Sequence, residues 1–487
     1  MYISKKVCVI AVLLGSTISF TLFSPAPINA AAFQMPEAVQ QQRGGTLIQS
    51  ADWDPYVKKT LNDFLVTYGK YSSTYDLKQR PYAVFDFDNT TSIMDVEEQL
   101  IVWQLEHLAF AIAPDDMGKV LETGIPTDKL DMTYGADDGS GRQVTVRDAI
   151  SDAAADYAVL YKKGLISVKG KMLDETVKQD LTYQDFVAKM RWLYDAISET
   201  MDSSVSYPWV TYWFTGMTPR QVYTLAYACD SYYGDPAKGQ TWSKGKYISP
   251  AENTKAGSVA VSYNQGITVT PEVKELYRAL YQNGIDVWID SASYIDVVRA
   301  AVDYFAIPDV KGIVAMTNQT DNKGRYINAY NYDLHAQTQG VGKSLAIKKV
   351  IAPLYQGHGP IFTAMDSQGD FNFTTEFKDT RAVLIMNRRR KDDAALCAGI
   401  AEYQKKHDIS LQQANLDGDT KFILQGRNEN TGALWPDDQT LLLGKTSKVF
   451  LSDRADDVVK NLEAGASIRD ILEKDTHNKD YNGYKTR

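Results

Sequence analysis

The sequence contains little cysteine and little histidine. Three cysteines occur in 487 residues, and Cys8 lies in the apolar N-terminal segment. Cys229 and Cys397 are therefore the one pair left for a disulfide, so a disulfide-rich scaffold is excluded. A bond between them and two unpaired buried thiols stay open as alternatives. The five histidines lack the spacing of zinc ligands, so a zinc centre is not expected.

The chain also lacks an excess of basic residues. It has 52 lysines and arginines against 61 aspartates and glutamates, which gives a formal net charge of −9. A negative chain repels polyanions, so we expect no binding to nucleic acid or to anionic lipid. Beyond the N-terminus no apolar run is long enough to span a bilayer.

The N-terminal residues have the pattern of a secretory signal peptide. Lys5 and Lys6 precede a short apolar run, and small residues follow at Ala30 to Ala32. The run is too short and too interrupted for a retained membrane anchor. We predict that residues 1–31 are removed, that the protein is exported to the periplasm or secreted, and that no membrane span remains.

The remaining chain is longer than one ordinary domain. An apolar strand at 82–87 is followed by a long helical pattern, and alternating helices and strands return from residue 270. This order predicts a parallel α/β core interrupted by a helical insertion. We expect a lead-in and the start of the core at 32–91, a helical cap at 92–268, the rest of the core at 269–473, and a flexible tail at 474–487. The segments 312–316 and 324–330 suggest a hairpin.

Reactive side chains follow several of the predicted strands. In open α/β sheets, ligands bind outside the carboxyl ends of the strands. A buried carboxylate needs a compensating partner, and an oxygen-lined site suits Mg²⁺. The residues in these positions are Asp86 and Asp88, Ser291, Asp366 and Asp370, with Lys343 at the start of the helix before the last strand.

The order of these residues resembles the haloacid dehalogenase superfamily. DFDNT at 86–90 matches the first motif and SAS at 291–293 the second, while Lys343 and DSQGD at 366–370 match the third and fourth. The resemblance runs from about Tyr82 to Asn387, apart from the insertion. It implies a Rossmann-like parallel sheet with a large, mainly helical cap inserted after the first motif strand. Met365 stands where the family usually has glycine.

Within the superfamily, the sequence looks most like the exported branch related to phosphoserine phosphatase and bacterial phosphorylcholine phosphatase. Two features suggest this branch: the acids that follow DNT within a dozen residues, and FTGMTP at 214–219 in the cap. The expected enzyme is a phosphatase that acts on a small phosphomonoester.

The expected chemistry uses the two aspartates of the first motif. A carboxylate at Asp86 can attack phosphorus and form an aspartyl phosphate, which divides one difficult displacement into two steps. Asp88 is placed to protonate the leaving alcohol and then to activate water. By resemblance, the backbone carbonyl of Asp88 also binds Mg²⁺.

The other motif residues are expected to hold phosphate and metal. Ser291 and Lys343 would bind the phosphoryl oxygens, although Lys348 or Lys349 could serve instead of Lys343. Asp366 and Asp370 would complete the metal site.

Acids at the start of the cap are candidates for reading the leaving group. Asp95, Glu97 and Glu98 follow the catalytic strand closely, so they can meet an amine or a quaternary ammonium, and phosphorylcholine is the best guess. The alternative is that acids suit a helix N-terminus. The aromatic run YPWVTYWF at 207–214 can attract a quaternary ammonium or form cap core.

Two further functions stay open. A phosphotransferase would hand the phosphoryl group to an alcohol, and the sequence does not separate it from a hydrolase. A non-catalytic exported binding protein could retain the fold, but binding alone has no need of Asp88. The sequence does not predict an oligomeric state.

Overall fold

The computed structural model describes residues 45–234, 242–250 and 254–487. The predicted signal peptide at 1–31 lies outside the described residues. Among the residues described, no helix combines the length and the apolar character needed to cross a membrane.

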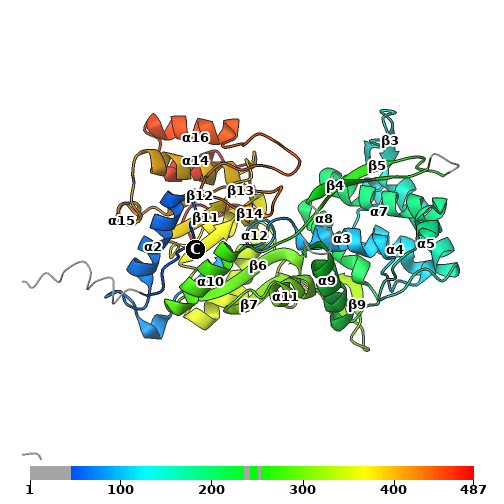
Figure 1. Cartoon of the computed structure of the whole chain (residues 1–487), viewed down its shortest axis with the longest axis horizontal. Helices are drawn as coiled ribbons and strands as arrows, with labels where there is room; N and C mark the ends of the chain where they lie inside the picture. Colours follow the sequence, from blue (N-terminus) through cyan, green and yellow to red (C-terminus); the bar gives the residue numbers. More distant parts are fainter. Residues whose placement is uncertain (1–44, 235–241, 251–253) are drawn as a thin grey trace, which may run out of the picture. The chain divides into compact units, whose positions relative to one another are not determined.

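A six-stranded parallel sheet forms the core, in the order β12-β11-β10-β1-β6-β7 (Figure 1). This arrangement confirms the predicted α/β class with a Rossmann-like core. The strands are β1 (Tyr82–Phe85), β6 (Asp286–Tyr294), β7 (Val310–Met316), β10 (Phe362–Met365), β11 (Ala382–Met386) and β12 (Lys421–Gln425).

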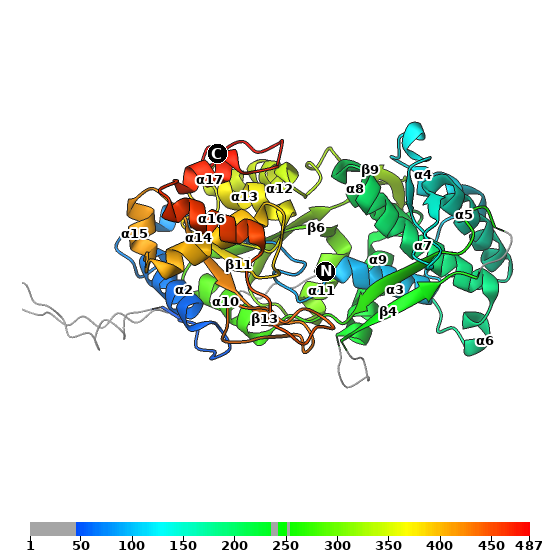
Figure 2. The ribbon, with the colours of Figure 1, turned by 90° about the horizontal axis from the view of Figure 1, so that it is seen from above.

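Strands β1 and β11 are apolar throughout because helices cover both faces of the sheet. Every residue of YAVF in β1 and of AVLIM in β11 is buried. One face packs against α2 (Pro55–Tyr68), α10 (Pro271–Gln282), α11 (Ile295–Tyr304) and α15 (Leu411–Leu416). The other face packs against α12 (Val341–Ala346), α13 (Phe371–Thr375), α14 (Ala394–Lys406), α16 (Asp453–Glu463) and α17 (Ile468–Lys474) (Figure 2).

The chain leaves the core after β1 and builds a cap. Its helices are α3 (Val96–Glu106), α4 (Met117–Glu122), α5 (Val146–Lys162), α6 (Glu175–Lys178), α7 (Leu181–Thr200), α8 (Ser203–Thr211) and α9 (Pro219–Tyr233). Two hairpins accompany them, β2 (Thr133–Gly135) with β3 (Gln143–Thr145) and β4 (Ser243–Ile248) with β5 (Ala260–Gln265).

The two connections between cap and core lie side by side. The Ile93 amide donates to the carbonyl of Thr268 at 2.8 Å, and the Thr268 amide donates back at 3.3 Å. Much of the cap has its own apolar cluster around α5 and α7, whereas α3 and α9 join the main core, where α9 packs on α11. The start of the cap is therefore held close to the carboxyl end of β1.

The predicted hairpin at 312–316 and 324–330 is wrong in its first strand. Residues 312–316 belong to β7, the edge strand of the sheet. The hairpin is formed instead by β8 (Asn318–Thr320) and β9 (Tyr326–Tyr330). The Tyr326 amide donates to the carbonyl of Met217 at 2.7 Å, so β9 is held against the cap.

The C-terminal tail, expected to be flexible, is packed against the core. Tyr484 is 2% exposed, and its hydroxyl accepts a hydrogen bond from the Thr420 amide at 2.7 Å. The Arg487 side chain pairs with the buried Glu376. These contacts satisfy buried polar groups of the core, and the polar composition of the tail gives no sign of them.

Cys229 and Cys397 are both buried and unbonded to each other.

The remaining elements are short. The short helices are η1 (Leu77–Gln79), η2 (Pro114–Asp116), η3 (Thr127–Lys129), η4 (Tyr212–Phe214), η6 (Ile347–Ile351), η7 (Ala352–Tyr355) and η8 (Gln368–Asp370), and the last strands are β13 (Arg427–Asn428) and β14 (Ala433–Leu434).

Candidate active site

A lysine bridges two carboxylates at the carboxyl end of the sheet. Asp86 directly follows β1, and its amide donates to the carbonyl of Ala364 in β10 at 3.1 Å, which fixes the end of the strand. Lys343 Nζ in α12 lies 2.6 Å from Asp86 Oδ1 and 2.7 Å from Asp370 Oδ1. The lysine is 1% exposed, so the structure brings together three predicted site residues from distant parts of the chain.

Asp366 completes a cluster of buried carboxylates. Asp86, Asp366 and Asp370 each offer an oxygen within 4.8 Å of the others. Arg388, which follows β11, donates from Nη1 to Asp366 Oδ2 at 2.8 Å. Lys343 and Arg388 thus occupy one oxygen each of Asp86 and Asp366, and the second oxygen of each carboxylate can face a cation. The oxygen-only donor set fits Mg²⁺.

The electrostatics of the cluster show the same need for a cation. Burial and then the charge of Asp370 raise the pKa of Asp86 to about 8, although Lys343 acts in the opposite direction. Burial likewise raises the pKa of Asp370. The lysine alone therefore leaves the carboxylates short of positive charge, and a divalent ion would favour their ionised forms.

Asp88 faces the second motif rather than the carboxylate cluster. Its Oδ2 accepts hydrogen bonds from Ser293 Oγ at 2.6 Å and Ser291 Oγ at 3.4 Å, and its Oδ1 accepts from the Val96 amide at 2.8 Å. Burial raises the pKa of Asp88 well above its ordinary value. A protonated carboxyl group in this position can donate a proton, as a general acid does.

Ser291 lies inside a strand, although the sequence suggested that it follows one. Strand β6 continues to Tyr294, with a shift of register between Ser291 and Tyr294. The residue is fully buried, and its carbonyl accepts a hydrogen bond from Thr338 Oγ1 at 2.6 Å.

The alternative lysines point elsewhere. Lys348 and Lys349 are exposed, and Lys349 Nζ donates to the carbonyl of Asp333 at 2.8 Å. Among the three lysines considered, Lys343 is the one in contact with the carboxylate cluster.

A cavity of about 110 Å³ opens between the first-motif aspartates and the cap. Glu97 is 6% exposed; its Oε2 accepts from the Tyr294 amide at 3.1 Å, while Oε1 has no hydrogen-bond partner among the described residues. Burial and then the charge of Asp95 raise the pKa of Glu97 to about 8. The lining residues are Asp86, Asp88, Asp95, Glu97, Tyr194, Ser198, Ser206, Tyr207, Val210, Ala292 and Ser293.

The three acids at the start of the cap have different surroundings. Asp95 caps α3 by accepting from the Glu98 amide at 2.8 Å, and it still lines the cavity. Glu98 is outside the lining and pairs with Arg191 of α7 at 2.7 Å. Asp95 and Glu97 are therefore in position to contact a ligand, whereas Glu98 ties two cap helices together.

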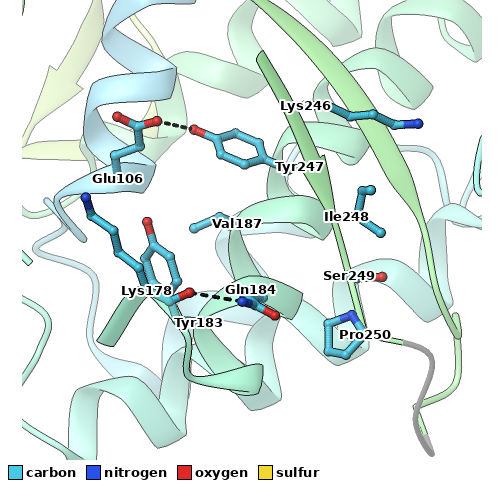
Figure 3. Close-up of a pocket in the computed structure, with 10 residues that line it drawn as sticks. All are labelled: Glu106, Lys178, Tyr183, Gln184, Val187, Lys246, Tyr247, Ile248, Ser249 and Pro250. Carbon is cyan, nitrogen blue, oxygen red and sulfur yellow. Dashed lines mark hydrogen bonds between the residues drawn. The ribbon is translucent and has the colours of Figure 1, made fainter. Parts of the chain in front are cut away.

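A larger cavity, of about 560 Å³, lies within the cap between α3, α7 and β4 (Figure 3). Its carboxylate, Glu106, accepts hydrogen bonds from Tyr247 at 3.0 Å, Tyr233 at 3.2 Å and Tyr263 at 3.3 Å. Because these hydroxyls already satisfy the carboxylate, we assign it a structural role and place the chemistry in the smaller cavity.

Three residues at the site were missed by sequence reasoning. Ser293 stood in the quoted SAS motif but was given no role. Arg388 and Arg427 come after the parallel strands β11 and β12, with one residue between in each case. The strand-end rule that selected Asp86 and Asp366 applies equally to these two strands, so it could have found both arginines.

No family model and no curated protein matches the chain. Among solved structures, a conserved protein of unknown function from Anaerococcus prevotii DSM 20548 has a TM-score of 0.67 and 26% sequence identity, over 81% of this chain and 98% of that one. The fold is therefore shared with that protein over most of this chain.

Two other solved structures overlap less well. A protein of unknown function from Bordetella pertussis Tohama I has 12% identity and a TM-score of 0.34, over 68% of this chain and 97% of that one. A phosphoserine phosphohydrolase-like protein from Francisella tularensis has 12% identity and a TM-score of 0.27, over 63% of this chain and 87% of that one. At such TM-scores neither likeness supports a conclusion.

Proposed function

We propose that this chain is a Mg²⁺-dependent phosphomonoesterase of the haloacid dehalogenase superfamily, exported from the cell, that hydrolyses a small phosphorylated metabolite. The observation that carries the proposal is the buried bridge from Lys343 to Asp86 and Asp370, with Asp366 within reach of the same ion. Mg²⁺ would be held by these three aspartates and by the backbone carbonyl of Asp88, and when bound it supplies positive charge to the phosphoryl oxygens.

In the first step, a carboxylate oxygen of Asp86 forms a bond to phosphorus while the bond from phosphorus to the alcohol oxygen breaks. Asp88 gives its proton to that leaving oxygen, and the alcohol departs. The raised pKa of Asp88 keeps the proton available for this transfer. Lys343 and Ser291 offset the charge on the phosphoryl oxygens.

In the second step, Asp88 takes a proton from a water molecule, whose oxygen attacks the phosphorus of the aspartyl phosphate. The bond between Asp86 and phosphorus breaks, inorganic phosphate leaves, and both aspartates return to their starting states. Each proton and bond is balanced over the two steps.

The proposed substrate is phosphorylcholine or a similar amino-alcohol phosphate. Two acids line the cavity next to Asp86, and Glu97 Oε1 has no hydrogen-bond partner among the described residues. In its ionised form, a carboxylate there would repel a phosphate unless a cation lies between them. The rings of Tyr194 and Tyr207, in the same lining, can face a quaternary ammonium.

The test is phosphate release from purified protein with phosphorylcholine, phosphoethanolamine, phosphoserine, glycerol phosphate and a nucleoside monophosphate. We expect turnover with Mg²⁺, none after exhaustive treatment with EDTA, and recovery when Mg²⁺ is restored. Full activity after chelation, or no release from any of the esters, would contradict the proposal.

A further inference from the structure

Two arginines from the C-terminal part of the chain, placed just after strands β11 and β12, contact residues of the site. Arg388 follows β11 and donates to Asp366 Oδ2 at 2.8 Å. Arg427 follows β12 and is 1% exposed. Both lie beyond Asn387, where the resemblance to the superfamily core ends, so the motif pattern assigns them no role.

Arg427 holds the loop that carries Asp88. It donates from Nη1 to the carbonyl of Asn89 at 2.6 Å and from Nη2 to Asn89 Oδ1 at 2.9 Å. Asn89 has a φ of 63°, a left-handed conformation that a non-glycine residue adopts at some cost. The two hydrogen bonds therefore hold, directly after Asp88, a backbone conformation that costs free energy.

Glu429 joins the two arginines. Its Oε1 lies 2.7 Å from Arg427 Nη2 and 3.6 Å from Arg388 Nε, and its Oε2 accepts from the Leu443 amide at 3.0 Å. Burial acts to raise the pKa of Glu429, but Arg427 and Arg388 outweigh it and the pKa is lowered. The glutamate is therefore ionised, and acidic and basic groups alternate along the chain of contacts.

The backbone around Gly426 packs closely against residues 437–441. A Cβ at Gly426 would lie 1.9 Å from the carbonyl oxygen of Gln439, so glycine lets residues 437–441 pack against the segment 426–429. The Glu429 amide donates to the carbonyl of Leu441 at 2.8 Å. Backbone hydrogen bonds from Gly426 and Glu429 to residues 437–441 therefore hold the segment that carries Arg427 and Glu429.

We propose that the sequence of contacts Asp366, Arg388, Glu429, Arg427 and Asn89 is a positioning relay, which keeps the metal ligand Asp366 and the loop of Asp88 in register with each other. Arg388 and Arg427 are positioning residues, because they act through Asp366 and Asn89. The inference rests on the proposed function, since register matters only if Asp88 must reach a substrate held at the metal. Loss of alignment by ~1 Å commonly costs ~10²-fold in turnover.

The first experiment needs no turnover. Mg²⁺ is titrated into the metal-free full-length mature protein by calorimetry, for the wild type, Arg388→Met and Arg427→Met. We expect Arg388→Met to weaken Mg²⁺ binding at least ~10-fold, because Asp366 loses its orienting partner. Arg427→Met should bind Mg²⁺ within ~3-fold of the wild type, because the metal ligands themselves keep their contacts.

The second experiment measures turnover with Mg²⁺ at saturation. Arg427→Met should lower kcat ~10²-fold with little change in KM, because Asp88 is displaced while binding is retained. Glu429→Gln keeps the shape and burial of the side chain, and it should lower kcat ~10-fold through loss of charge alone. This variant tests the relay even if Arg427→Met does not fold.

Two controls separate positioning from general stability. Arg80→Met breaks the pair of Arg80 with Asp286, 2.7 Å apart at the amino ends of β1 and β6, and it should lower Tm without changing kcat. In the double variant Arg388→Met with Arg427→Met, the loss in kcat should be smaller than the product of the single losses, because both break one relay.

Each failure has a separate meaning. A wild type that neither binds Mg²⁺ nor turns over any ester overturns the proposed function, and the relay falls with it. If the wild type binds Mg²⁺ and turns over an ester, two outcomes overturn the relay alone. One is an unchanged kcat in both Arg427→Met and Glu429→Gln. The other is a double variant in which the two single losses in kcat multiply.

Discussion

Two lysines of this chain lie between pairs of buried aspartates, one at the sheet edge and one in the cap. Lys343 contacts Asp86 and Asp370, while Lys189 of α7 lies 2.9 Å from Asp152 Oδ2 and 2.7 Å from Asp185 Oδ2. By residue type the two clusters are nearly the same. They differ in what surrounds the charges.

In the cap, Lys189 and both oxygens of Asp152 are hydrogen-bonded, whereas Asp185 Oδ1 and Oδ2 of the neighbouring Asp156 have no hydrogen-bond partner among the described residues. Lys189 Nζ donates a third hydrogen bond to Thr254 Oγ1 at 2.9 Å, and Asp152 also accepts from the Lys255 and Ala256 amides. These bonds tie α5, α7 and the residues after 253 together. At the sheet edge, Lys343 makes two such bonds and three carboxylates share one small space. The difference indicates that the convergence of three carboxylates at strand ends, rather than buried charge as such, marks a reactive site.

The largest expected effect comes from removing one carboxylate from each cluster. Asp86→Asn should lower kcat at least ~10³-fold, because the nucleophile is lost. Asp185→Asn should keep kcat, but it should lower the free energy of unfolding by about 3 kcal/mol, because Lys189 loses a buried partner. Phosphate release and chemical denaturation measure the two quantities. Substantial turnover by Asp86→Asn would remove it from the nucleophilic role.

The lysines themselves should show a smaller contrast. Lys343→Met should reduce kcat ~10²-fold, because charge on the phosphoryl oxygens is no longer offset. Lys189→Met should destabilise the cap by about 3–5 kcal/mol and leave the kcat of the folded protein unchanged. Measurements of kcat and of thermal unfolding for both variants at saturating Mg²⁺ test these two expectations. Equal kcat losses in the two variants would mean that Lys189 reaches the chemistry through the cap.

The sequence predicted the sheet-edge cluster because its members follow strands or open a helix, and parallel strands bring such positions to one edge. Glu98 shows where that reasoning stops. It is one residue from Glu97 on the same helix, but its carboxylate pairs with Arg191 of α7. Local spacing in the sequence does not predict a partner on another cap helix. The tail contacts of Tyr484 and Arg487 are non-local in the same way.

The cap cluster was not predicted at all, because its residues occupy helix interiors. Asp152 and Lys189 lie on α5 and α7, where charged residues usually face solvent. Only the packing of the two helices against each other buries them. The fold class, by contrast, was predicted from alternating strands and helices over long stretches. Each of these elements has a local pattern of apolar residues that the sequence shows directly.

The pH dependence of stability should separate the clusters further. In the metal-free protein, burial and then Asp370 raise the pKa of Asp86 to about 8; burial and then Asp185 raise that of Asp156 in the cap to about 8. A folded-state pKa above the unfolded value means that the folded form binds the proton more tightly. The stability from each group is complete below about pH 4 and is lost as the pH rises to about 8.

The prediction is that Tm of the metal-free protein falls by a few degrees across this range. Mg²⁺ should reduce the part of this pH dependence of Tm that is due to Asp86, because it favours the ionised carboxylate. Asp86→Asn should therefore flatten the profile only without Mg²⁺, and Asp156→Asn should flatten it equally with and without Mg²⁺. Scanning calorimetry at fixed ionic strength measures both, and identical profiles for the two variants would show that the clusters do not titrate independently.

The smallest expected effect concerns the leaving group. Glu97 has a buried oxygen without a hydrogen-bond partner in the described chain, Asp95 lines the same cavity, and Glu98 is paired with Arg191. Glu97→Gln and Asp95→Asn should raise KM for phosphorylcholine about 10-fold and leave KM for glycerol phosphate nearly unchanged, because only the first substrate brings a cation to the acids. Glu98→Gln is the matched control on the same helix, and it should change both KM values little. If Glu97→Gln and Asp95→Asn raise both KM values alike, these acids act as helix-start residues and the amino-alcohol substrate is wrong, while the carboxylate cluster and its chemistry stand.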